Sequence, residues 1–174
     1  MSWKVLIERG NLEFSAAHFI TFEGQCEPLH GHNYGVRVEA SGDLTPDSYV
    51  IDFVTLKNTV RTLIKEWDHR FLLPLNSPHL RVTERDDAWE VEYDAHNRYV
   101  LAKLAVVPLP VDNATAERLA EQLALRIVAA LTERGVAHSL QRLTVGIEET
   151  QMQAAFYTLD LRRADGMLHE RPPG

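Results

Sequence analysis

Two long amphipathic segments in the middle of the chain constrain its fold most strongly. The first, residues 53–67, carries apolar side chains at helical spacing behind Asp52, which is a typical helix N-cap. The second, residues 114–134, repeats this pattern between Asn113, the expected cap, and Gly135. Each stripe predicts a helix with one buried face, and such a face needs a second layer to cover it.

Two pairs of alternating segments can supply that second layer. Residues 3–18 and 30–41 precede the first helix, and residues 141–149 and 153–161 follow the second. Apolar and polar side chains alternate along them, as in strands that are buried on one face only. The order predicts an α+β fold, in which a four-stranded antiparallel sheet carries two helices on one face.

The segment around residues 87–107, between the two helices, predicts an inserted β-hairpin with its turn at D-A-H-N. Trp89, Val91 and Tyr93 would give this hairpin one apolar face. We therefore expect it to act in subunit assembly or in packing at the rim of a functional site.

The length of the chain predicts one domain, from residue 1 to residue 162. Residues 163–174 have no apolar period, so we expect a mobile C-terminal tail. No apolar run approaches the roughly 20 residues of a membrane span, and the first residues lack the apolar stretch of a signal peptide. A cytoplasmic protein is the expectation.

Charge and cysteine content narrow the class of function. The formal net charge is −7, whereas a nucleic acid or an anionic membrane would need a basic surface, so neither is an expected partner. The single cysteine, Cys26, cannot form an intramolecular disulfide, which agrees with a reducing compartment.

The sequence His30-Gly31-His32 is the first chemical signal. On a strand, residues i and i+2 point to the same side, about 6.6 Å apart along the chain. Two imidazoles placed in this way can converge on one ion, and His18, at the end of the preceding strand, could supply a third. Three histidines with one open position are typical of catalytic zinc. The alternative is that these histidines are unrelated, because the chain has eight of them.

Five short motifs, read together, resemble the 6-pyruvoyl- and 6-carboxy-tetrahydropterin synthase family. Their order and approximate spacing both match, over roughly residues 5 to 161 apart from an insertion. The motifs are F-S-A-A-H (14–18), C-E-P-L-H-G-H-N-Y (26–34), V-I-D-F-x-x-L-K (50–57), D-H (68–69) and I-E-E-T (147–150).

The resemblance implies a fold and an assembly. The family has the tunnelling fold, a four-stranded antiparallel sheet with two helices between its second and third strands, which agrees with the element order above. Its subunits join their sheets into barrels, commonly as a hexamer with active sites between subunits. Barrel closure would also cover the exposed edges of a small open sheet.

The resemblance also implies residue roles. Zinc would be bound by His18, His30 and His32. The catalytic residues would be Cys26, Asp68 and His69, the last two supplied by a neighbouring subunit. Substrate would be bound by Glu149, which anchors the pterin ring, by Thr115 and, as an additional candidate, by Glu27. A cysteine near a cation and near His69 would have a depressed pKa and could act as a base.

The implied substrate is 7,8-dihydroneopterin triphosphate. The C-x-x-x-H-G-H spacing resembles the enzymes of queuosine synthesis, which form 6-carboxy-5,6,7,8-tetrahydropterin and release acetaldehyde and triphosphate. The neighbouring E-x-x-H-G-H, from Glu27, resembles a branch that forms 6-hydroxymethyl-dihydropterin for folate. The alternatives are formation of 6-pyruvoyl-tetrahydropterin and a zinc cyclohydrolase-like activity on the same fold. A further alternative is a non-catalytic pterin-binding or assembly protein that keeps only the fold, but the joint presence of the metal-binding, catalytic and pterin-binding motif residues argues against it.

Overall fold

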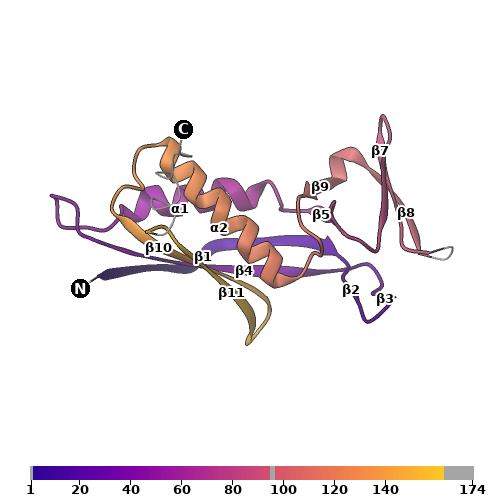
Figure 1. Ribbon diagram of the computed structural model, residues 1–174, viewed down its shortest axis with the longest axis horizontal. Helices are drawn as coiled ribbons and strands as arrows, with labels where there is room; N and C mark the ends of the chain where they lie inside the picture. The colour runs from indigo at the N-terminus through magenta and orange to yellow at the C-terminus, as the bar shows by residue number, and fades with distance from the viewer. Residues whose placement is uncertain (1, 95–96, 163–174) are drawn as a thin grey trace, which may run out of the picture.

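The computed structural model describes residues 2–94 and 97–162, so the tail expected at 163–174 lies outside the described part. Two helices lie side by side on one face of a twisted sheet, as Figure 1 shows. The helices are α1 (Phe53–Lys65) and α2 (Ala116–Glu133), and the strands of the sheet are β1 (Trp3–His18), β4 (His30–Gly42), β5 (Arg70–Pro74), β9 (Val106–Leu109), β10 (Leu140–Thr150) and β11 (Gln153–Asp160). The predicted α+β architecture is confirmed.

The four predicted strands form one antiparallel unit, in the spatial order β11-β10-β4-β1. In the pairing of β1 with β4, Trp3 lies opposite Gly42 and His18 lies opposite His30, with one shift of register between Glu8 and Glu13. The helix-facing side chains along these strands are buried, as the alternation predicts.

Two short strands extend the sheet beyond β1, of which the sequence did not reveal β5 and revealed only the first half of β9, as the end of the expected hairpin strand. The new neighbour β5 runs parallel to β1, with Ala16 opposite Arg70, and β9 runs parallel to β5. Both are apolar runs of four or five residues without clear alternation, so periodicity could not distinguish them from core segments of another kind.

The insertion between the helices is a three-stranded antiparallel sheet and not the two-stranded hairpin expected. Its strands are β6 (Arg81–Glu84), β7 (Ala88–Glu92) and β8 (Arg98–Ala102). A short 3₁₀ turn, Lys103–Ala105, follows β8, so the second half of the expected hairpin strand belongs to β9 of the main sheet. In Figure 1 the inserted sheet stands at the end of the molecule where β2 (Thr21–Phe22) and β3 (Gln25–Cys26) also lie.

The helix N-caps are only partly as predicted. Asp52 caps α1, because its carboxylate accepts a hydrogen bond of 2.7 Å from the backbone N–H of Thr55. The cap of α2 is Thr115 and not Asn113. The Asn113 side chain instead bonds the backbone of Thr21 in both directions, which ties the start of α2 to the β2 segment.

One main core fills the space between the sheet and both helices. The strands of the sheet and the inner faces of α1 and α2 both contribute to it, and the most deeply buried helical side chains include Leu56, Val60, Leu119, Leu123, Ile127 and Leu131. Among the described residues, none of the helices is long and apolar enough to cross a membrane. The core therefore fixes the helix layer against the strands that carry the histidines.

A substitution on α2 tests this core. Ile127 is fully buried, so Ile127→Ala is expected to lower the free energy of unfolding by about 2–5 kcal/mol, through lost apolar burial and the cavity left behind. Leu125, on the same helix, is 43% exposed, and Leu125→Ala is expected to cost far less. Denaturant unfolding at one fixed protein concentration measures both, and equal losses would contradict the packing described.

Candidate active site

Three histidine side chains meet at one end of the antiparallel unit. The ring centroids of His18, His30 and His32 lie 4.6–5.1 Å apart. One potential ligand atom from each ring lies within 4.8 Å of the other two, close to the span that one ion with bonds of about 2.1 Å can bridge. The convergence predicted from the sequence is present, and these residues could hold a metal ion.

Strand register brings the three rings together. His18 is the last residue of β1 and lies directly opposite His30, the first residue of β4, while His32 follows on the same face. Gly31 allows the close approach of the two strands, because a Cβ at this position would lie 2.8 Å from the carbonyl oxygen of Ala16. A side chain at residue 31 would therefore push the histidine-bearing strands apart.

His18 is oriented for ligation by one hydrogen bond. Its Nδ1 lies 2.8 Å from the carbonyl oxygen of Ala114, and because a carbonyl can only accept, Nδ1 carries the proton. The Nε2 lone pair is buried and has no hydrogen-bond partner. Burial lowers the pKa of His18 to about 4, so the imidazole is neutral at pH 7, which is the form that binds metal.

His30 is held in the same way. Its Nδ1 donates to the carbonyl oxygen of Pro28 over 2.9 Å, which leaves the lone pair of Nε2 free to bind a metal ion. Histidine ligands in proteins commonly donate their second ring N–H to such an acceptor. The buried, unpartnered Nε2 of His18 and the matched tautomer of His30 both fit a bound divalent ion.

Glu149 lies at the edge of the histidine cluster. One carboxylate oxygen is 3.9 Å from Nε2 of His18, and burial raises the pKa of Glu149 above its usual range. Tyr34, two residues after His32, is fully buried against the rings of His18 and His32, and its hydroxyl has no hydrogen-bond partner. The alternation of its strand predicts Tyr34 only as a member of an apolar face and does not reveal its place beside the cluster.

Cys26 and Glu27 lie at the end of a short hairpin, and of the two the structure places Glu27 beside the cluster. Strands β2 and β3 are joined by Glu23 and Gly24, both with positive φ, a two-residue turn that fits the twist of a hairpin. A carboxylate oxygen of Glu27 lies 3.9 Å from Nε2 of His30. The thiol of Cys26 is half-buried and points to the carbonyl oxygen of Glu27.

Within the single chain, the surroundings of Cys26 favour its neutral thiol. Burial, followed by the charges of Asp94 and Glu27, raises the pKa of the Cys26 thiol. The depressed pKa expected from the sequence applies to a thiol beside a bound cation and beside His69 of a neighbouring subunit, and it stays a prediction. In this chain the nearby charges are carboxylates, and they disfavour the thiolate.

Asp68 and His69 form a carboxylate–imidazole pair directly before β5, the strand that pairs with the end of β1. Nδ1 of His69 lies 2.9 Å from Asp68, and the backbone N–H of Ser15 donates to the other carboxylate oxygen over 2.8 Å. That N–H bond, followed by His69, lowers the pKa of Asp68. His69 has a φ of 58° and its side chain is 81% exposed. In the described residues its polar partners are Asp68 and Ser15, so the chain does not itself bring His69 to Cys26.

Thr115, expected to bind substrate, has a structural partner. Its hydroxyl accepts a hydrogen bond of 3.4 Å from the backbone N–H of Arg118 as the N-cap of α2. The preceding carbonyl, that of Ala114, orients His18. The start of α2 therefore supports the cluster through its backbone, a role that residue types alone could not reveal.

Comparisons with known proteins identify the family to which the chain belongs. The family model described as 6-pyruvoyl tetrahydropterin synthase matches residues 8–160. A putative 6-carboxy-5,6,7,8-tetrahydropterin synthase of Methanocaldococcus jannaschii is 33% identical over 147 residues, which cover 84% of this chain and 89% of that protein. Dihydroneopterin monophosphate aldolase of Pyrococcus furiosus is 42% identical over 59 residues, 34% of this chain and 50% of that protein.

A solved structure is also similar. The 6-pyruvoyltetrahydropterin synthase of Plasmodium vivax superimposes with a TM-score of 0.86 at 29% identity, covering 92% of this chain and 99% of that chain. It was solved as a variant in which a glutamate, described as a catalytic residue, is replaced by alanine. The chain belongs to the 6-pyruvoyl tetrahydropterin synthase family, and its architecture is the tunnelling fold of that family.

Removal of one ligand tests the metal centre. His32→Ala is expected to weaken binding of Zn²⁺, used as the probe ion, by more than the roughly 10–100-fold that loss of an outer hydrogen-bond partner costs. His138→Ala removes an exposed histidine that lies outside the cluster and is expected to leave Zn²⁺ binding unchanged. Competition against a chelator measures both constants, and equal affinities for the two variants would exclude the three-histidine centre.

Proposed function

We propose that the protein is a zinc-dependent lyase acting on 7,8-dihydroneopterin triphosphate. The proposed products are 6-carboxy-5,6,7,8-tetrahydropterin, acetaldehyde and triphosphate, in a step of queuosine synthesis. The observation that carries the proposal is the three-histidine cluster with Glu149 beside it, 3.9 Å from His18. The name of the Methanocaldococcus jannaschii relative, a putative 6-carboxy-5,6,7,8-tetrahydropterin synthase, supports this product.

The metal site would hold zinc through His18, His30 and His32. Three neutral imidazoles and no cysteine ligand are typical of catalytic zinc with an open position. When bound, zinc would supply Lewis-acid stabilisation of negative charge on the side-chain oxygens of the substrate. Ala114 and Pro28 keep His18 and His30 in the tautomers this role needs, by accepting their Nδ1 protons.

Glu149 would anchor the pterin ring. An ionised carboxylate can accept two hydrogen bonds, from the amino group and the ring N–H of the pterin. Burial raises the pKa of Glu149, and these two donors would favour its charged form on binding. The reacting side chain of the substrate would then lie over the histidines, because Glu149 adjoins His18.

Cys26 or Glu27 would remove the proton from the substrate carbon. Cys26 is the family's catalytic position, and its raised pKa means that substrate, metal or a neighbouring subunit must favour the thiolate before it can act. Glu27 already lies 3.9 Å from His30. The catalytic glutamate of the Plasmodium vivax relative supports a glutamate base as a second option.

The second candidate is cleavage to 6-hydroxymethyl-dihydropterin. Glu27 beside His30 favours it, together with the local similarity to a dihydroneopterin monophosphate aldolase. Formation of 6-pyruvoyl-tetrahydropterin and a cyclohydrolase-like hydrolysis remain as outcomes of the same assay.

Product analysis separates these activities. Zinc-loaded protein with 7,8-dihydroneopterin triphosphate is expected to give 6-carboxy-tetrahydropterin and acetaldehyde. Cys26→Ala is expected to lower this rate by roughly 10²–10⁴-fold, the range of a lost general base, whereas Glu27→Gln keeps most of it. Chromatography of the pterins and trapping of the aldehyde measure both. Unchanged turnover in Cys26→Ala would instead assign the base to Glu27.

We further propose that active sites form between subunits of a hexamer. His69 projects outward, in a backbone conformation held by Ser15, and does not meet Cys26 in its own chain. A neighbouring subunit could receive it, so that Asp68 orients His69 beside the Cys26 of another copy. Pairing of strands β11 and β9 across subunits would also cover the edges of the sheet.

Complementation tests this arrangement. The variant Cys26→Ala/Glu27→Gln and the variant His69→Ala are each expected to be nearly inactive. Assembled together, they are expected to regain part of the activity, because some interfaces then combine intact groups from both chains. No recovery in mixed oligomers of confirmed mass would show that both groups act within one chain.

A further inference from the structure

The inserted sheet buries its inner face in a second hydrophobic cluster, separate from the main core. Its fully buried members are Phe19, Phe71, Leu73, Val91 and Val106, and the partly buried side chains packed against them include Cys26, Trp89, Tyr99 and Leu101. The cluster therefore joins the insertion to the hairpin that carries Cys26. Small clusters of this kind commonly lie beneath loops that need support.

An aromatic contact connects the insertion to the strand that carries a histidine of the cluster. Phe19 directly follows His18, and its ring stacks on Tyr99 of β8, with centroids 5.5 Å apart and planes at 22°. The ring of Phe71, two residues after His69, also packs on the ring of Phe19, with centroids 5.3 Å apart. Phe19 stands between His18 and the β2–β3 hairpin, so its packing fixes the direction in which the hairpin leaves β1.

The hairpin needs such support. Strands β2 and β3 have two residues each, and an isolated two-stranded ribbon is marginally stable at best in water. On one side Asn113 bonds the backbone of Thr21. On the side of the insertion, the second hydrophobic cluster packs against Cys26 and thus supports the hairpin.

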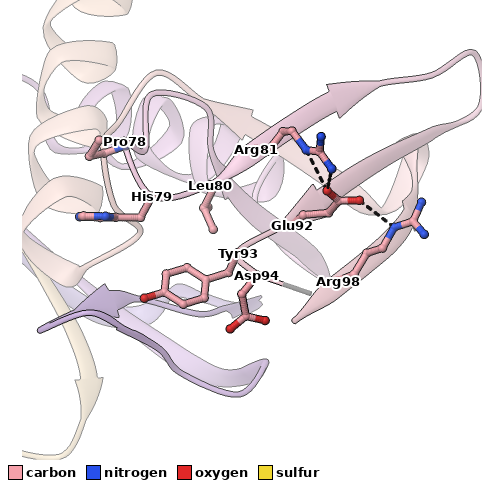
Figure 2. A pocket seen from close by; sticks show the side chains of 8 residues that line it. All are labelled: Pro78, His79, Leu80, Arg81, Glu92, Tyr93, Asp94 and Arg98. Carbon is pink, nitrogen blue, oxygen red and sulfur yellow. Dashed lines mark hydrogen bonds and ion pairs between the residues drawn. The ribbon is translucent and has the colours of Figure 1, made fainter. Parts of the chain in front are cut away.

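The outer face of the insertion is charged. Glu92 pairs with Arg81 and Arg98, and Glu90 pairs with Arg85 and Arg98. Figure 2 shows the Glu92 pairs as dashed lines near the start of the β7–β8 turn at Tyr93 and Asp94. The ion pairs lie on the outer face, whereas Val91 and Trp89 pack in the second hydrophobic cluster together with Cys26 of the β2–β3 hairpin. The apolar face of the insertion is therefore covered within its own chain. Of the two roles expected for the insertion, the structure favours packing at the rim of the site.

We infer that the inserted sheet is a positioning element, in which Tyr99 holds Phe19 and thereby sets the β2–β3 hairpin, with Cys26 packed on the second hydrophobic cluster and Glu27 beside His30. Asp94, at the β7–β8 turn, adds a charge that acts on the Cys26 thiol. The inference rests on the proposed function only in taking this hairpin as the reacting side of the site. Tyr99 touches none of the reacting groups and would act through Phe19.

The test compares neighbouring residues of β8. Tyr99→Ala is expected to lower kcat on 7,8-dihydroneopterin triphosphate roughly threefold to tenfold, the effect of losing one aromatic pair, with KM nearly unchanged because Glu149 is untouched. Reaction of Cys26 with a thiol reagent should become faster by a similar factor, and no other cysteine contributes to that signal. Zn²⁺ content and oligomer mass should stay as in the wild type. Val100, 62% exposed, gives the control Val100→Ala, which should change nothing.

Wild-type kcat and thiol reactivity in Tyr99→Ala would overturn the inference. Should Tyr99→Ala not fold, Tyr99→Leu, which keeps apolar volume without a stacked ring, is expected to give the same two changes. Loss of folding in both variants would also overturn it, because Tyr99 would then be a general core residue. If the wild type does not turn over this substrate, the proposed function fails, while the thiol reaction still decides the positioning role.

Discussion

The pairing of the end of β1 with the start of β4 is the constraint on which the site depends. It sets His18 opposite His30 and, by the two-residue period of a strand, places His32 on the same face. The two backbones approach so closely at Gly31 that no side chain fits there. A slip of one residue would turn His30 and His32 to the opposite face of the sheet, so the buried helix-facing core and the histidine cluster are specified by the same register.

Burial gives this cluster its chemical character. An imidazole inside the protein is less easily protonated, and His18 remains neutral with its free lone pair aimed at the other two rings. Burial also raises the pKa of Glu149 and, separately, that of the Cys26 thiol. The Glu149 carboxylate and the Cys26 thiolate therefore each need a favourable partner to form. The chain thus holds ligands that are ready for a cation, beside acids whose ionisation depends on what binds.

Features with a local period could be predicted from the sequence. The two helical stripes, the four long strands and the Asp52 cap follow from the spacing of apolar residues, and the shared face of His30 and His32 follows from strand parity. The five motifs identified the family and, through it, the positions of His18 and Glu149.

Features that depend on contacts between distant segments could not be predicted. The short strands β5, β6 and β9 have too few residues to show a period, and their pairing is set by neighbours far away in the chain. Asn113 resembles a cap in sequence, but its amide finds a better partner in the backbone of Thr21. The stacking of Tyr99 on Phe19 joins residues that nothing in the sequence relates.

The chemistry proposed for this site requires that three imidazoles from two paired strands hold one zinc ion. Anomalous diffraction from crystals of the zinc-loaded protein, collected on both sides of the zinc absorption edge, tests this requirement most directly. We expect one peak per subunit, about 2.0–2.1 Å from a ring nitrogen of each of His18, His30 and His32, with a fourth position left for water or substrate. Zinc bound at other residues, or no peak among these rings in crystals of confirmed zinc content, would contradict the account.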